Sequence, residues 1–292
     1  MNQRAKTVRS LVPAIRMMLS GSTLKSGSFV ELDQLIETDP EKITVRLGRT
    51  ISVFRGDPEV VLKQIDAAKA DIGEYLFIED LGLLGLSANK SKVEQKLATV
   101  RKVSRGADLP EPVAAPQFRK ALYNRVVVVT GGAMGFGEGI ARHLFGEGAN
   151  VVIMDINKQA GKAMAAELNE HRSTNRAWFV EADVSSLESM EQAVYETILE
   201  FGGLDVLISN AGILKAGSIE EMSEEDFDQV TRVNYRGYFN CVKAVVPVMK
   251  LQNRYAEHNF GDIIQINSKS GLEGSKKNFA YAGGKFGGIG LT

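Results

Sequence analysis

The sequence has few of the residues that form disulfide bonds or bind structural metal ions. Among its 292 residues are one cysteine, one tryptophan and three histidines. A single cysteine, Cys241, excludes an internal disulfide framework, and it lies in an apolar helical pattern typical of a core residue rather than a nucleophile. The histidines are scattered late in the chain (His143, His171 and His258), so we predict no metal centre.

Long hydrophobic runs and an excess of one charge are also missing. No apolar run approaches the ~18 residues that a membrane-spanning helix needs. The formal net charge is −1, which provides no overall attraction to nucleic acid or to an anionic membrane. Together with the low cysteine content, these absences predict a cytoplasmic protein without nucleic-acid or membrane partners.

The first part of the chain, residues 1–105, predicts a small α+β region. We expect helices at 8–19, 57–72 and 91–103, and strands at 43–45, 50–54, 75–78 and 83–86. Pro13 is expected near a helix start, and Ser20 to Ser28, rich in glycine and serine, is expected to be a loop. Basic residues without acidic ones before Val30 fit either a basic helix, which we favour, or an organellar transit peptide.

Segment 106–122 concentrates proline among small residues, which is typical of a semi-rigid linker. After it, in 123–292, apolar strands and amphipathic helices alternate regularly. This alternation predicts an α/β fold with a Rossmann-like, doubly wound parallel sheet, which binds ligands at the carboxyl ends of its strands. The expected strands are 126–130, 151–155, 177–181, 206–209 and 263–267, and the expected helices are 135–148, 158–170, 186–201 and 224–252.

The strongest local signal is V-V-V-V-T-G-G-A-M-G-F-G at 126–137. A buried strand running into glycines allows a tight turn and a close backbone approach to a ligand. The helix that follows begins with unpaired N–H groups, which favour a phosphate. We therefore expect Gly131, Gly135, Phe136 and Gly137 to bind a dinucleotide, although tight strand–helix packing alone also explains such a turn.

Polar groups follow the next strands. Asp155 ends the second strand, where a carboxylate accepts the ribose hydroxyls of an adenosine and repels a 2′-phosphate. Neither Ala133 nor Met134 offers a positive charge to a 2′-phosphate, so we expect NAD rather than NADP. Taken alone, an aspartate at a strand end is also explained as an ordinary helix cap. Two further groups are expected to contact the cofactor, or else form plain turns: Asp183 and Val184 after the third strand, and Asn210, Ala211 and Gly212 after the fourth.

Reactive groups are placed late in the chain. Tyr281 and Lys285 have i, i+4 spacing and share one helix face, as many surface pairs do. A free tyrosine has a pKa of ~10, and an adjacent ammonium lowers the pKa so that the phenolate becomes a usable base. Ser268, at the end of the fifth strand, is placed to hydrogen-bond the same substrate oxygen, with Ser270 as the competing choice.

In order and spacing, these motifs resemble the short-chain dehydrogenase/reductase family over residues 125–292. The resemblance implies that Ser268 positions the reacting oxygen, that Tyr281 is the acid/base, and that Lys285 binds the nicotinamide ribose. It also implies that Asn234, in V-N-Y-R-G, holds a water for proton relay. A homo-oligomer is expected where the family's domain is complete.

The sequence departs from the family in three places. Lys269 stands where a small or apolar residue is usual, and the helix after Tyr281 contains Gly283, Gly284, Gly287 and Gly288, each costing ~1 kcal/mol of helix propensity. Close packing or simply a weak helix explains those glycines. The chain stops at Thr292, before segments that the family normally has, so we expect a dehydrogenase domain that is incomplete at its C-terminus.

The first region resembles part of a class II aldolase/adducin-like domain of the kind fused ahead of bacterial sugar dehydrogenases. The resemblance rests on L-V-P-A-I-R-M-M-L-S, on the segment around Arg49 and on Y-L-F-I-E-D-L-G-L-L-G. Family aldolases bind zinc through clustered histidines, which this sequence lacks, so the region is interpreted as an aldolase remnant. Its basic segment then matches the interior of a bacterial enzyme, which favours the helix over the transit peptide.

The sequence therefore predicts an NAD-dependent oxidoreductase that interconverts an alcohol and a carbonyl on a sugar, a polyol or a sugar phosphate. The substrate class depends on the fusion resemblance alone. Two alternatives stay open. One is a truncated, non-catalytic dinucleotide-binding or assembly chain, and the other is a bifunctional aldolase/dehydrogenase.

Overall fold

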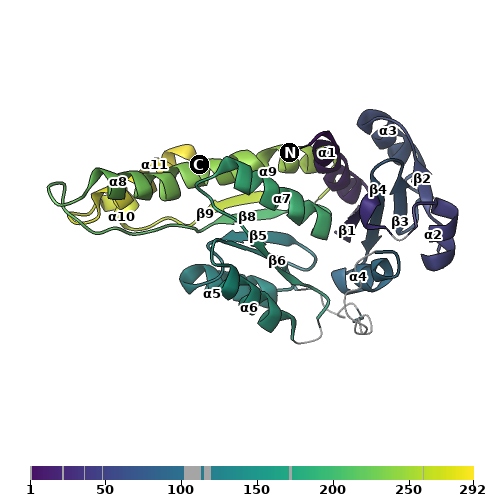
Figure 1. Ribbon diagram of the computed structural model, residues 1–292, viewed down its shortest axis with the longest axis horizontal. Coiled ribbons are helices and arrows are strands. Elements are labelled where there is room, and N and C mark those ends of the chain that lie inside the picture. Colours follow the sequence, from purple (N-terminus) through teal and green to yellow (C-terminus); the bar gives the residue numbers. More distant parts are fainter. Residues whose placement is uncertain are drawn as a thin grey trace.

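The structure is a computed structural model with two packed regions (Figure 1). Most of the predicted 106–122 linker lies outside the residues that the structure describes. The described residues are 2–21, 23–35, 37–47, 49–101, 113–114, 120–170, 173–258 and 260–292. No described helix is long and apolar enough to cross a bilayer.

The first region is a four-stranded mixed sheet in the order β1-β4-β3-β2, flanked by helices. β2 and β3 are parallel, whereas β1 and β3 each pair antiparallel with β4. This confirms an α+β region. Its strands are β1 (Ser26–Glu31), β2 (Ser52–Phe54), β3 (Tyr75–Ile78) and β4 (Gly82–Ser87), and its helices are α1 (Gln3–Met18), η1 (Leu32–Gln34), α2 (Pro40–Leu47), α3 (Pro58–Ala68) and α4 (Lys90–Ala98).

Three predictions for this region are wrong. The strand expected at 43–45 lies inside α2, because Pro40 occupies the first helical turn and the Asp39 carboxylate accepts the Glu41 N–H at 3.0 Å. The loop expected at Ser20 to Ser28 becomes β1 from Ser26 onward. Pro13 lies inside α1, which starts earlier than expected, at Gln3.

The second region is a five-stranded parallel sheet in the order β7-β6-β5-β8-β9, which confirms the doubly wound fold. The strands are β5 (Val126–Thr130), β6 (Asn150–Asp155), β7 (Ala177–Glu181), β8 (Val206–Ser209) and β9 (Asp262–Gln265). The helices are α5 (Gly135–Gly146), α6 (Lys158–Asn169), α7 (Leu187–Phe201), α8 (Glu224–Thr231), the π-helical η2 (Arg232–Arg236), α9 (Gly237–Tyr255), α10 (Ser270–Glu273) and α11 (Phe279–Leu291).

Helices cover both faces of this sheet. α5 and α6 lie on one face, and α7 and α9 lie on the other (Figure 1). Successive side chains of β5 point to opposite faces of the sheet and fit this arrangement. Val127 and Val129 join the core beneath α5 and α6, while Val126 and Val128 join the core beneath α7 and α9. The near-continuous apolar strand is thus explained by burial on both sides.

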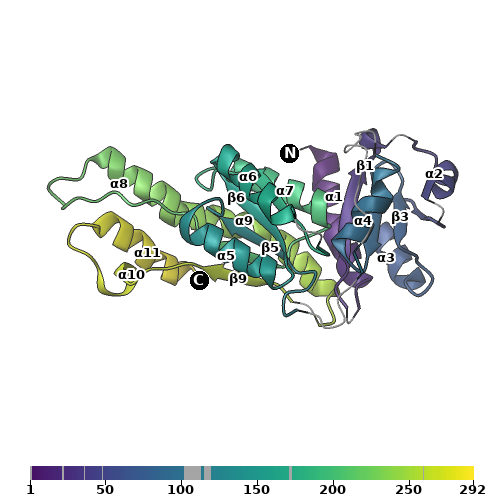
Figure 2. The same cartoon turned by 90° about the horizontal axis from the view of Figure 1, so that it is seen from below.

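The first region packs on the second through α1. Val8, Leu11 and Ile15 of α1 share one hydrophobic core with Val245 and Val248 of α9. Seen from below, α1 lies between the body of the first sheet and the α7–α9 layer (Figure 2). The two regions therefore share one hydrophobic core, although each also has a smaller core of its own.

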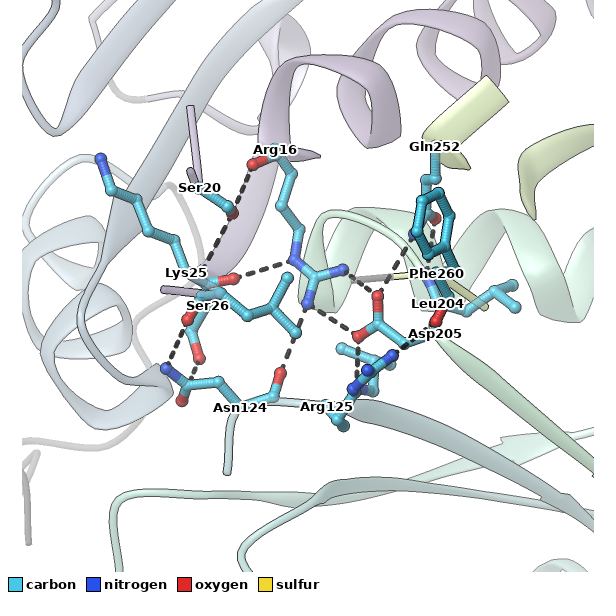
Figure 3. Close-up of polar contacts among 12 residues, drawn as sticks. Arg16, Ser20, Lys25, Ser26, Asn124, Arg125, Leu204, Asp205, Gln252 and Phe260 are labelled. Atoms are coloured by element: carbon cyan, nitrogen blue, oxygen red, sulfur yellow. Dashed lines mark hydrogen bonds and ion pairs between the residues drawn. The ribbon is translucent and has the colours of Figure 1, made fainter. Parts of the chain in front are cut away.

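A buried ion pair lies inside this contact, where the fully buried Arg16 guanidinium donates to both carboxylate oxygens of Asp205 at 3.0 and 2.9 Å (Figure 3). Asp205 also accepts from the Val126 N–H at 2.7 Å and from the Gln252 amide at 3.3 Å. Arg16 further donates to the Asn124 carbonyl at 3.3 Å. We call these five residues the Arg16 network, and they link α1 directly to the first residue of β5.

Candidate active site

The turn after β5 is built at contact distance from the neighbouring strand end. Gly131 and Gly135 have φ of 61° and 58°, a conformation that favours glycine. A Cβ on Gly137 would lie 1.9 Å from the Gly131 carbonyl oxygen, and a Cβ on Gly131 would lie 2.8 Å from Cα of Ala211. In front of Gly135 there is open space. The glycines thus let the turn close while leaving room at the start of α5.

Thr130 and Asn210 join this turn to the loop after β8. The Thr130 hydroxyl accepts the N–H groups of Asn210 and Ala211, both at 3.1 Å. In return, the Asn210 amide donates to the carbonyls of Thr130 and Gly131, both at 3.1 Å. Sequence reasoning missed Thr130, although a hydroxyl ending an all-valine strand was a usable signal.

Asp155 ends β6 beside the same turn. One carboxylate oxygen accepts the Ala133 N–H at 3.1 Å, and the other accepts the Asn157 N–H at 2.9 Å. Each oxygen keeps a further lone pair, so the carboxylate is oriented but can still accept hydroxyl groups. On the next strand end, Asp183 accepts the Ser185 N–H at 2.8 Å, and Val184 is buried with its carbonyl held by Asn240 at 2.9 Å.

The helix α11 presents Tyr281 and Lys285 on one face. The Lys285 side chain is only 6% exposed, and its ammonium lies 5.7 Å from the centre of the Tyr281 ring. Burial lowers the pKa of Lys285. Its ammonium donates to the Ile266 carbonyl at 2.5 Å, which fixes it beside the end of β9.

Ser268 lies three residues beyond Gln265, the last residue of β9, so that strand ends earlier than predicted. Its hydroxyl accepts the Ser270 N–H at 3.2 Å and thereby starts the short α10. Both serines line the same cavity as Tyr281. The competition between Ser268 and Ser270 for the substrate oxygen therefore stays open.

One cavity of about 1020 Å³ runs along the carboxyl ends of the strands and brings most of the predicted residues together. Apolar and amide side chains that sequence reasoning missed, with no local motif to mark them, also line it: Ile213, Leu214, Gln229, Val233 and Asn278. The predicted residues among its lining are Gly131, Phe136, Gly137, Asp155, Asp183, Val184, Asn210, Ala211, Gly212, Ser268, Tyr281 and Lys285.

Two predicted residues are not part of the lining. Gly135 begins α5 beside the glycine turn. Asn234 lies in the π-helical turn between α8 and α9, and both polar ends of its side chain bind the backbone of Ile213, at 2.8 and 2.9 Å. Its side chain anchors the loop after β8, and its part in a proton relay stays a prediction.

The described residues contain no group of three or more potential metal ligands of the His, Cys, Asp or Glu type. Cys241 is buried, and burial raises the pKa of its thiol to about 12, which fits the core position predicted for it. The ionisable and hydroxyl groups that line the cavity include the Tyr281 phenol, the Lys285 ammonium, the hydroxyls of Ser268 and Ser270, and the carboxylates of Asp155 and Asp183.

A glycine-rich turn, a strand-end carboxylate and a Tyr–Lys pair line one cavity of a doubly wound α/β sheet. The family model of the short chain dehydrogenases matches residues 125–292, more than half of the chain. The chain belongs to this family, whose members are NAD(P)-dependent oxidoreductases acting on alcohol and carbonyl groups. The match begins at residue 125, so it leaves the first region unassigned.

Individual relatives agree with this assignment. The chain is 38% identical over 172 residues to a trans-4-hydroxycyclohexanecarboxylate dehydrogenase of Sinomonas cyclohexanicum, an alignment that covers 58% of this chain and 64% of that protein. It is 37% identical over 169 residues to the sorbitol-6-phosphate 2-dehydrogenase of Escherichia coli, covering 58% and 63%. The chain spans a little under two thirds of the length of these relatives.

A solved structure supports the fold. The short-chain dehydrogenase/reductase of Brucella melitensis described as a glucose/ribitol dehydrogenase superposes with a TM-score of 0.52 at 28% identity. The superposition covers 60% of this chain and 70% of that one.

Proposed function

We propose that the chain is an NAD-dependent oxidoreductase that interconverts an alcohol and a carbonyl on a sugar, a polyol or a sugar phosphate. The observation that carries this proposal is the single cavity that extends from Asp155 to Tyr281 and Lys285. Oxidation of an alcohol by NAD needs a group that binds the adenosine end of the dinucleotide and a proton acceptor beside its nicotinamide end. Asp155 and Tyr281 are suited to these two roles.

The residues around the turn fit a dinucleotide. The open space in front of Gly135 lies at the start of α5, where unpaired N–H groups favour the pyrophosphate. Asp155 would hold the adenosine ribose, and its charge favours NAD over NADP. When bound, the nicotinamide supplies the hydride acceptor. Asp183 and Val184 would contact the adenine side, and Asn210, Ala211 and Gly212 the nicotinamide side.

At the other end of the cavity, Tyr281 would take the proton of the substrate hydroxyl. The Lys285 ammonium lies 5.7 Å from the centre of the Tyr281 ring and would place a positive charge beside the oxygen that takes the proton. Ser268 would hydrogen-bond the same oxygen and hold it near the phenol. Together these side chains would perform general acid–base chemistry without a metal.

The mouth of the cavity favours a substrate with an anionic group. Lys276 and Lys277 are exposed just before Asn278, which lines the cavity, and the Lys277 carbonyl accepts the Gly217 N–H at 2.8 Å from the facing loop. Within the described residues, neither lysine has a carboxylate at ion-pair distance. The names of the two relatives above also carry an anionic group, a carboxylate and a phosphate.

A substrate panel tests the proposal. We expect NADH formation from sugar alcohols, and a kcat/KM about 10-fold higher for their phosphates, because one charge-assisted contact is worth about 1.5 kcal/mol. Replacing Lys276 and Lys277 together with alanine should remove the preference for phosphates, whereas Lys42→Ala, at an exposed lysine of the first region, should keep it. Equal rates with sorbitol and its phosphate would contradict the anionic substrate.

The same panel separates the alternatives. A non-catalytic dinucleotide-binding chain would gain thermal stability from NAD without forming NADH from any alcohol. A bifunctional aldolase/dehydrogenase would also cleave a sugar phosphate. The aldolase-like origin of residues 1–105 and the assembly of homo-oligomers stay proposals, and the packing of α1 on α9 supports a structural role for the first region.

Replacing Asp155 with asparagine is expected to reverse the cofactor preference. The variant keeps the side-chain shape but loses the charge, so NAD binding should weaken roughly 10-fold and NADP binding should improve by a similar factor. Glu181→Gln is the matched control, because Glu181 is the register partner of Asp155 on β7 but does not line the cavity. The dissociation constants of NAD and NADP are measured for each protein. An unchanged ratio of the two constants in Asp155→Asn would refute the role of Asp155 in selecting NAD.

A further inference from the structure

The segment between β9 and α10 carries a polar residue that the proposed chemistry does not use. Asn267 lies directly before Ser268, and its side-chain amide is partly buried at the edge of the cavity. Its oxygen accepts the Ser268 N–H at 2.7 Å. Its nitrogen donates to the Lys285 carbonyl at 3.0 Å and to the Gln265 amide oxygen at 3.3 Å. One amide thus joins the serine segment to the helix that carries Tyr281 and Lys285.

The surrounding packing keeps this contact short. A Cβ on Gly271 would lie 2.5 Å from the Asn267 amide oxygen and 2.9 Å from Cβ of Lys285. A Cβ on Gly288 of α11 would meet the Gln265 side chain at 2.1 Å. The glycines at these two places therefore allow the end of β9 to lie directly against α11. This close approach explains part of the glycine content that the sequence showed around Tyr281.

Lys285 is consequently held at both ends by consecutive residues. Its ammonium donates to the Ile266 carbonyl, and its own carbonyl accepts from Asn267. A shift of α11 along the strand end would move the ammonium relative to Tyr281, and it would also change the separation of Tyr281 from Ser268. Misplacement of about 1 Å is enough to lower a rate roughly 100-fold.

We propose that Asn267 is a positioning residue, which fixes the register between Ser268 and the Tyr281–Lys285 face of α11 through its bonds to the Ser268 N–H and the Lys285 carbonyl. Asn267 then acts on the reaction through these residues. This inference rests on the alcohol oxidation proposed above.

The test compares Asn267→Ala and Asn267→Asp with the wild-type protein. Aspartate keeps the acceptor for the Ser268 N–H but cannot donate to the Lys285 carbonyl. We expect both variants to lose about 10- to 100-fold in kcat, with KM and the NADH dissociation constant changed less than about threefold. This split between kcat and the two binding constants is a readout that a loss of stability alone does not produce.

Asn169→Ala is the matched control. The Asn169 side chain also makes two hydrogen bonds to the backbone, accepting from the Ala177 N–H at 3.0 Å and donating to the Ala177 carbonyl at 2.8 Å. It lies at the amino end of the strands, away from the cavity. Its loss should lower stability without lowering kcat. Gly271→Ala provides a second route to the same effect if the Asn267 variants do not fold, since its Cβ would push Asn267 and Lys285 apart.

The outcomes separate the two proposals. A wild-type kcat in every folded Asn267 and Gly271 variant would overturn the positioning role and leave the oxidoreductase intact. A wild-type protein that oxidises no alcohol would overturn the proposed function and this inference with it. A comparable loss of kcat in Asn169→Ala would show that general destabilisation causes the loss, which also overturns the positioning role.

Discussion

Tyr281→Phe is expected to lower kcat for alcohol oxidation by about 10³-fold, while the NADH dissociation constant stays within a few-fold of the wild-type value. Phenylalanine fills the same volume but cannot take the proton of the substrate hydroxyl, and a positioned acid–base group contributes about 10²- to 10⁴-fold. The Lys285 ammonium lies 5.7 Å from the centre of this ring, and Tyr281 lines the cavity in which the substrate is expected. Steady-state rates and a fluorescence titration with NADH measure the two quantities.

Tyr255→Phe is the control for this change. Tyr255 is the last residue of α9, and it does not line the cavity. Its replacement should leave kcat within about twofold. If Tyr281→Phe keeps more than a tenth of the wild-type rate, the acid–base assignment is wrong, and another group must take the proton.

Arg16→Met is expected to lower the free energy of unfolding by about 3–5 kcal/mol. Methionine preserves most of the apolar stem but leaves Asp205 buried without its counter-charge, and such a carboxylate costs more than the lost pair contributes. Because Asp205 also accepts from the Val126 N–H, the change should loosen the start of β5 as well. Urea-induced unfolding, followed by circular dichroism, gives the free energy.

Arg55→Met provides the matched comparison. Arg55 pairs with Glu79 at 3.0 Å, but the two side chains are 70% and 47% exposed. Water screens this pair, so its loss should cost less than about 1 kcal/mol. Equal effects of the two substitutions would show that the Arg16 network contributes no more than a surface ion pair.

The sequence predicted the second region well because its signals are local. The valine strand, the glycine turn and the strand-end Asp155 each depend on neighbouring residues, and a parallel sheet brings its carboxyl ends to one edge without further information. The i, i+4 spacing placed Tyr281 and Lys285 together for the same reason. Convergence of these residues on one cavity therefore followed from topology alone.

The first region was harder because its signals conflict. Ile43, Thr44 and Val45 favour a strand by composition, yet Asp39 and Pro40 start a helix there, and short apolar runs do not separate the two by period. β1 was hidden by its glycine and serines, although Gly27 packs against the chain at Phe201 and Gly202. Contacts between distant segments, such as Arg16 with Asp205 or Asn267 with Lys285, leave no trace in local spacing.

The contact between α1 and α9 has a consequence for synthesis on the ribosome. Arg16 and Asp205 are separated by 189 residues, and the apolar partners of α1 come later still, in α9. At about 5–20 residues per second, α1 leaves the ribosome roughly 10–40 s before Asp205 is made. During that interval the apolar face of α1 has no partner from α9, so the packing of α1 against α9 forms only after translation has passed α9. A chaperone that binds α1 would act in that interval.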